Sequence, residues 1–109
     1  MTAFAPRQRL QNRRPHWLYR FECDGQSYTG GIGRFDDGRI AEIFINGAKV
    51  GTAAETNAQD AALVASLALQ HGCPIETIRH ALARPGVGAG PLATLLDEVE
   101  SQRDGDPHD

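Results

Sequence analysis

Lys49 is a candidate for an anion-binding or catalytic lysine, because it follows the apolar run and the Asn46-Gly47 pair of EIFINGAKVG. Its ammonium group, together with the backbone N–H groups of Gly47 and Gly51, would suit a phosphate. The stretch lacks the GxxxxGK[ST] spacing that wraps nucleotide phosphates. Nothing nearby in sequence supplies the burial or second cation that activates a catalytic lysine. We interpret Asn46-Gly47 first as a turn that ends a strand, with phosphate contact by Lys49 as the alternative.

Arginines near the N-terminus form the second candidate site. The first twenty positions hold no acidic residue and five arginines, which are Arg7, Arg9, Arg13, Arg14 and Arg20. Because Trp17 and Tyr19 lie among them, the segment combines phosphate contacts with a stacking surface for bases. The C-terminal end is acidic, and the whole chain has a formal net charge of −3. The basic segment could therefore bind nucleic acid or a nucleotide, or pair with the acidic end.

Cysteine and histidine do not indicate a metal or catalytic site. Cys23 and Cys73 form no CxxC pair, and the four histidines are scattered along the chain. We therefore predict no metal site, no cofactor and no catalytic residue, and we expect the two cysteines to be reduced thiols. The N-terminus lacks the apolar run of a secretory signal, and no stretch is apolar enough to span a bilayer. We accordingly expect a cytoplasmic protein without a membrane partner.

Three strands precede the helices in the predicted order of elements. HWLYRFEC at 16–23 alternates apolar and polar residues, and Asp24-Gly25 is a two-residue hairpin signal. QSYTGGIGRF at 26–35 is weakened by three glycines, which indicate a bulge or a close backbone approach, so we expect this strand to be bent. RIAEIFI at 39–45, which follows a turn at 36–38, is the most apolar of the three, and we expect it to be central or well covered.

The second half predicts helices. Thr56 and Gln59 fit a capping box, and the run at 60–72 ends at Gly72, so we expect a helix buried on most sides. Its small residues would let a partner approach closely, and they are our candidates for self-association: Ala61, Ala65 and Ala68. Pro74 starts a second helix and Pro91 a third. The predicted class is α+β, a three-stranded antiparallel meander followed by two to three helices packed on one face.

The predicted organisation is one domain at 16–101, between a basic flexible arm at 1–15 and an acidic disordered tail at 102–109. For the domain itself, we considered self-association through an open sheet edge rich in glycine, or through the small residues of the first helix.

Three stretches carry a family resemblance: RQRLQNRRPH, GRFDDGRIAEIFINGAKVGT and AALVASLALQHGCPIETI. They resemble the C-terminal TSCPD domain of adenosylcobalamin (vitamin B12)-dependent ribonucleotide reductases, and short stand-alone bacterial proteins built from that domain. The resemblance covers about residues 7–83. The Thr-Ser-Cys-Pro-Asp motif that gives the domain its name is absent, since the matching loop reads GTAAETNAQD.

The resemblance implies kinship with a reductase without its activity. The thiyl radical, active-site cysteines and cobalamin site of that family belong to a large barrel, which 109 residues cannot contain. The hypothesis is therefore a non-catalytic accessory or protein-interaction domain, with a protein partner or a second copy as its ligand. The alternative is nucleic-acid or nucleotide binding through the arginine-rich arm.

Overall fold

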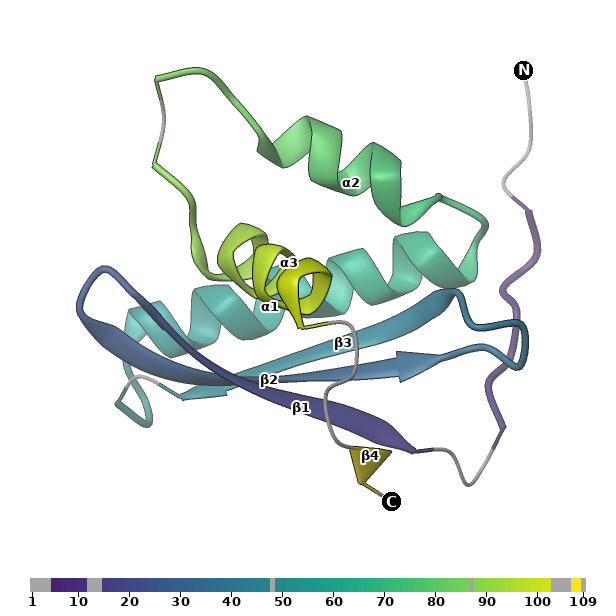
Figure 1. Ribbon diagram of the computed structural model, residues 1–109, viewed down its shortest axis with the longest axis horizontal. Helices are drawn as coiled ribbons and strands as arrows, with labels where there is room; N and C mark the ends of the chain where they lie inside the picture. Colours follow the sequence, from purple (N-terminus) through teal and green to yellow (C-terminus); the bar gives the residue numbers. More distant parts are fainter. Residues whose placement is uncertain (1–4, 12–14, 48, 87, 103–106, 109) are drawn as a thin grey trace.

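The structure is a computed structural model, and it describes residues 5–11, 15–47, 49–86, 88–102 and 107–108. Its elements follow one another as β1 (His16–Cys23), β2 (Gln26–Arg34), β3 (Ile40–Gly47), α1 (Ala53–Gln70), α2 (Ile75–Leu82), α3 (Pro91–Ser101) and β4 (Pro107–His108). The strands form one antiparallel sheet in the order β3-β2-β1-β4 (Figure 1). The predicted α+β class and three-stranded meander are confirmed.

Turn chemistry sets the register of the first hairpin. Asp24 and Gly25 both have positive φ, 51° and 75°, as a type I′ turn requires. The turn joins β1 to β2 with Cys23 opposite Gln26, and the pairing then runs without interruption to His16 opposite Gly33. Trp17, Tyr19, Phe21 and Cys23 consequently point to the same face, as their alternation predicts.

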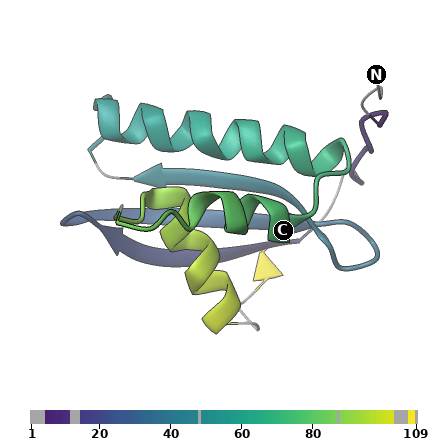
Figure 2. The same ribbon diagram turned by 90° about the horizontal axis from the view of Figure 1, so that it is seen from above.

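The expectation that the third strand is central is wrong for its place in the sheet. β2, the glycine-bearing strand, lies between β1 and β3, and β3 is at the edge. The residues of β3 that face the helices are nevertheless buried, and α1 runs alongside this strand (Figure 2). The pairing of β2 with β3 shifts register between Gly33 and Arg34, which is the irregularity expected in this strand.

The first helix begins one turn earlier than Thr56 predicts. Thr52 is the N-cap, and its hydroxyl accepts a hydrogen bond from the Glu55 N–H at 3.3 Å. At the other end Gly72 has a φ of 98°, and the Gly72 and Cys73 N–H groups donate to Leu69 and Ala68. These two bonds form a Schellman motif, so the predicted end at Gly72 is confirmed.

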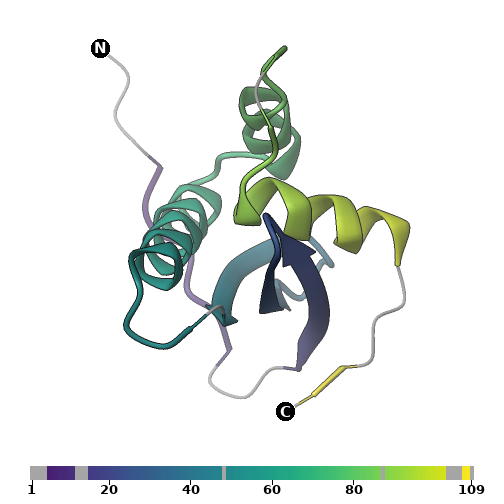
Figure 3. The same cartoon turned by 90° about the vertical axis from the view of Figure 1, so that its left-hand side faces the viewer.

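All three helices lie on one side of the sheet (Figure 3). The core between the layers contains Ile32, Ile43, Ile45 and Leu95, each at most 2% exposed. Fully burying one such side chain contributes roughly 1.5–3 kcal/mol. α2 lies farther from the sheet, and its Ile75, Ile78 and Leu82 pack against this core, as their helical spacing predicts (Figure 1).

Part of the basic arm lies against the domain. The Gln8 N–H donates to the Gln70 carbonyl at 2.7 Å, and the His71 ring bonds the Ala5 carbonyl at 2.7 Å. Residues 5–11 therefore run along the end of α1 (Figure 1). In the acidic tail, β4 pairs His108 with His16 of β1. Within the part of the chain that the structure describes, no helix is long and apolar enough to cross a membrane.

Candidate interaction surface

The face of the sheet opposite the helices carries two large apolar side chains. Leu18 of β1 and Phe44 of β3 are each 47% exposed, and both stand opposite Gly31 of β2. A Cβ added at Gly31 would lie 3.4 Å from Leu18 and 3.6 Å from Phe44. Because Gly31 has no side chain, the apolar groups of the two outer strands approach each other over the central strand.

The neighbouring row of this face carries a hydrogen-bonded pair of side chains. His16 and Glu42 lie on either side of Gly33, and His16 Nε2 is 2.9 Å from Glu42 Oε1. A Cβ at Gly33 would meet Glu42 Cγ at 2.7 Å, so glycine is what allows the pair to bridge β2. The His16 ring also packs edge-on against Phe44, with centroids 5.4 Å apart. The pair therefore helps to hold Phe44 in position.

The outer side of α1 is the second apolar area. Leu63 is 60%, Val64 65% and Leu67 36% exposed. The expectation that this helix is buried on most sides is wrong, because one side only faces the sheet. The small residues that we named as candidates for self-association are not part of this exposed area. Ala65 is buried, and Ala61 and Ala68 are half-buried.

A groove joins the two apolar areas at the edge of the sheet. It has a volume of about 450 Å³, and Phe44 of β3 and Leu63 of α1 both line it. Arg7, Asn46 and Gln59 contribute polar groups to the same groove. We call Leu18, Phe44, Leu63, Val64 and Leu67 together the apolar surface. It extends from the open face of the sheet around β3 to the outer side of α1.

Polar residues of α1 bond the free edge of β3 beside this groove. The Ile43 N–H donates to Ser66 Oγ at 2.8 Å. The one proton of the Ser66 hydroxyl has two carbonyl acceptors, Ala62 at 2.8 Å and Ile43 at 3.1 Å. The Gln70 amide donates to the Ala41 carbonyl at 3.0 Å. Sequence reasoning missed this role. Its signal is the placement of Ser66 and Gln70 in an otherwise apolar helical run.

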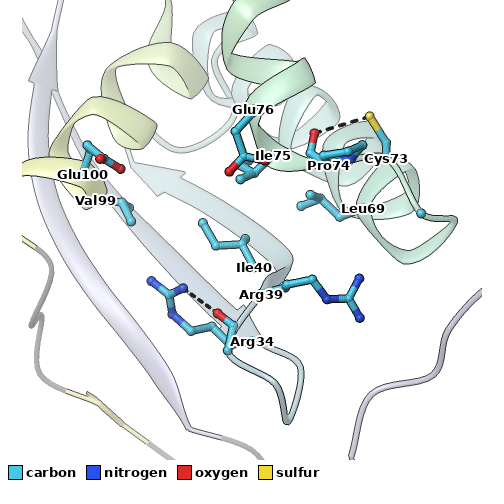
Figure 4. A pocket seen from close by; sticks show the side chains of 12 residues that line it. Arg34, Arg39, Ile40, Leu69, Cys73, Pro74, Ile75, Glu76, Val99 and Glu100 are labelled. Atoms are coloured by element: carbon cyan, nitrogen blue, oxygen red, sulfur yellow. Dashed lines mark hydrogen bonds between the residues drawn. The ribbon is translucent and has the colours of Figure 1, made fainter.

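A cavity of about 540 Å³ lies at the other end of the molecule, between α2, α3 and the start of β3 (Figure 4). Ile40, Leu69, Ile75 and Val99 give it apolar walls. Three of its charged residues bond other protein groups: Arg34 donates to the Gly38 carbonyl at 2.8 Å, Arg39 donates to Asp37 and Gln8, and Glu100 pairs with Arg79. The Arg39 N–H and guanidinium together lower the pKa of Asp37. These bonds organise the cavity's rim.

The loop around Lys49 already holds an anion of the chain itself. The Gly51 N–H donates to Glu55 Oε1 at 3.1 Å, and the Gly47 N–H lies 3.4 Å from Glu55 Oε2. The Lys49 carbonyl accepts from Thr52, while the Lys49 side chain is exposed. Asn46-Gly47 ends β3, so the turn interpretation is confirmed, and the amides considered for a phosphate bond Glu55 instead.

The structure does not gather the predicted basic residues into one site. The Arg7 guanidinium donates to Gln70 Oε1 at 2.6 Å, beside the groove. Arg9 and Arg20 are exposed on different parts of the molecule, in the N-terminal segment and on β1. Arg13 and Arg14 lie outside the described residues. In the described part of the chain, no three histidine, cysteine or acidic side chains come together as ligands for a metal ion.

Comparison with known proteins identifies a matching family and related proteins. A family model described as the TSCPD domain matches residues 6–100. The vitamin B12-dependent ribonucleotide reductase of Agrobacterium fabrum is 39% identical over 70 residues, and that of Bradyrhizobium diazoefficiens is 33% identical over 70 residues. In both comparisons the match covers 64% of this chain and 6% of the relative. No solved structure matches the chain.

Proposed function

The chain belongs to the TSCPD domain family, and from that premise we propose that it is a non-catalytic accessory domain that binds a protein partner. The apolar surface is the observation that carries the proposal. It includes Leu63 and Val64, which are 60% and 65% exposed on the 18-residue helix α1. A partner that packs along this helix would bury both side chains. Contiguous apolar surface of this kind is characteristic of interaction sites.

The composition of the surface favours a protein as the ligand. An aromatic side chain, Phe44, lies beside aliphatic ones, and the groove between them is lined by Arg7, Asn46 and Gln59. Protein interfaces combine an apolar centre that is rich in aromatic residues with a polar rim that supplies hydrogen bonds. Phe44 is the residue most suited to anchor a partner, because its ring is half exposed and the His16 ring holds it from one side.

The non-catalytic part of the proposal rests on the share of the relatives that the chain covers. The chain spans about 6% of the length of the reductases that it matches, so most of each reductase has no counterpart in it. Three charged residues that line the cavity between α2, α3 and β3 are bonded to other protein groups, which is the arrangement of a structural rim: Arg34, Arg39 and Glu100. Because the relatives are ribonucleotide reductases, a ribonucleotide reductase is the first partner to test.

Affinity capture with matched baits tests the proposal. The baits are the wild-type chain, the double variant Phe44→Ser with Leu63→Ser, and Val50→Ser as the control. Val50 is 90% exposed and does not line the groove. We expect a protein that the wild type and Val50→Ser retain and the double variant loses, while circular dichroism shows all three folded. If every retained protein binds the three baits equally, the apolar surface is not the binding site.

Nucleic-acid or nucleotide binding through the arginine-rich arm is the second candidate. It is favoured by the exposure of the Arg9 and Arg20 side chains. Fluorescence anisotropy of labelled single- and double-stranded DNA tests it at two salt concentrations, with Arg9, Arg13 and Arg14 changed together to Ala. Phosphate contacts predict binding that weakens as salt rises and is lost in the variant. The absence of wild-type binding at low salt would remove this candidate.

A further inference from the structure

The two long edges of the sheet differ in how far other parts of the chain bond their backbone groups. At the β3 edge, Ser66 Oγ accepts from the Ile43 N–H and lies 3.1 Å from the Ile43 carbonyl, and Gln70 bonds the Ala41 carbonyl. Such bonds keep another strand from pairing there. At the β1 edge, β4 pairs only with His16 and Trp17. Among the described residues, no other strand pairs with this edge between Leu18 and Cys23.

The geometry of the hairpin fixes which groups of β1 reach this edge. A two-residue turn closes on a hydrogen-bonded pair, which here is Cys23 with Gln26. Since hydrogen-bonded pairs alternate along an antiparallel ladder, Phe21 and Tyr19 also bond β2. The N–H and carbonyl groups of Leu18, Arg20 and Glu22 therefore point outward. The same alternation places the backbone groups of Ala41 and Ile43 outward on β3, where α1 bonds them.

We propose that the β1 edge pairs with the β1 edge of a second copy of this chain. The strands run antiparallel about a two-fold axis at Phe21, and the two β3-β2-β1 meanders become one continuous sheet. In this register Arg20 of one protomer lies opposite Glu22 of its partner, and Glu22 lies opposite Arg20. Both are hydrogen-bonded pairs formed by outward-pointing groups, and both place opposite charges side by side on the open face.

Charge selects this register over its neighbours. An axis at Arg20 would place two arginines opposite each other, and an axis at Glu22 would place two glutamates there, which is unfavourable for side chains only about 5 Å apart. An axis at Tyr19 would leave Arg20 opposite Leu18. The charges of Arg20 and Glu22 discourage pairing with unrelated apolar strands, whereas a second copy in the register about Phe21 neutralises both.

The register also sets where the helices of the two protomers lie. An axis normal to the sheet keeps the helices of both protomers on the same side. Leu95 of α3 packs on Gly30, which lies opposite Tyr19 and so to one side of the axis. The C-terminal end of α3 extends beyond β1 above the sheet (Figure 2). The two α3 helices are then related by the axis, and the C-terminal end of each extends toward the partner.

Charge reversal tests the proposal through the mass measured by analytical ultracentrifugation over a range of protein concentration. We expect wild type to form dimers. Arg20→Glu places acidic pairs opposite one another, and Glu22→Arg places basic pairs there, so each single variant should shift to monomer. The double variant Arg20→Glu with Glu22→Arg restores opposite charges and should dimerise again. An equimolar mixture of the two single variants should also regain dimers.

The outcomes separate this proposal from the apolar surface. The variant Phe44→Ser with Leu63→Ser leaves the β1 edge intact and should dimerise like wild type. Arg20 and Glu22 are both exposed, so the charge variants should keep the wild-type circular dichroism spectrum. A wild-type chain that stays monomeric at the highest concentration would overturn the proposal. So would single variants that remain dimeric, or a double reversal that fails to recover the dimer.

Discussion

Gly30 and Gly31 are neighbours on β2, so side chains added at these two positions would point to opposite faces of the sheet. A Cβ at Gly30 would lie 2.4 Å from Leu95, which is buried, whereas one at Gly31 would lie at ordinary contact distance from Leu18 and Phe44. Gly30→Ala should therefore lower the free energy of unfolding by about 1–3 kcal/mol. Gly31→Ala should change it by less than about 0.5 kcal/mol. Urea denaturation of both variants measures the difference, and equal effects would contradict this packing.

At the same scale, Tyr28 makes stability depend on pH. Its ring is buried and stacks on Phe21, and burial raises the pKa of Tyr28 above its ordinary value of 10.0, with further contributions from Cys23 and Asp24. The folded phenol keeps its proton where the unfolded one has lost it, so the free energy of unfolding falls as pH rises above about 10.

Tyr28→Phe tests this linkage, because phenylalanine does not titrate. Urea unfolding of wild type and variant at about pH 8 and about pH 10.5 compares the two slopes. We expect the variant to lose less stability than wild type between these conditions. An equal loss in both proteins would show that another group causes the alkaline dependence.

The start of helix α1 provides a test at the scale of an element, because two threonines are candidates for its N-cap. Thr52 accepts the Glu55 N–H, whereas Thr56 is exposed inside the first turns of the helix. Thr52→Ala should cost about 1 kcal/mol of stability. Thr56→Ala should be neutral or slightly stabilising, since alanine has the higher helix propensity. Thermal unfolding distinguishes the two, and a larger loss at Thr56 would place the start of the helix where the sequence alone places it.

These two threonines show which features of the fold could be predicted from the sequence and which could not. The strands, turns and C-terminal cap follow from local chemistry, such as the positive φ at Asp24 and Gly25, and were predicted. The start of α1 was not, because Thr52 with Glu55 and Thr56 with Gln59 both fit the local pattern. Glu55 also bonds the N–H groups of Gly47 and Gly51, and that tertiary context favours the earlier cap.

The candidate site was less predictable than the fold. An apolar run such as that around Leu63, Val64 and Leu67 indicates a helix but not which of its sides meets the sheet. Ala62 and Ala65 are buried because small side chains let α1 approach β3, and this leaves the bulky residues outside. The arginines were predicted from their density in the sequence, and the fold separates Arg9 from Arg20.

For the whole molecule, the one-sided arrangement of the helices creates the surfaces that we propose for interaction. The three helices cover one face of the sheet (Figure 3). Because the central strand carries glycines, the opposite face shows Leu18 and Phe44 beside the bridging His16 and Glu42. α1 bonds one edge of the sheet and exposes its own apolar side next to it. We propose that the apolar surface binds a protein partner and that the β1 edge pairs with a second copy.

Site-specific photocrosslinking in living cells tests the central claim most directly. A benzophenone amino acid is introduced in place of Phe44, Leu63 or, as the exposed control outside the surface, Val50. If the apolar surface binds a protein, the probes at Phe44 and Leu63 will crosslink to the same partner, identified by mass spectrometry, and the probe at Val50 will not. Probes at Phe44 and Leu63 that yield no crosslink, or only those seen from Val50, would contradict the proposed function.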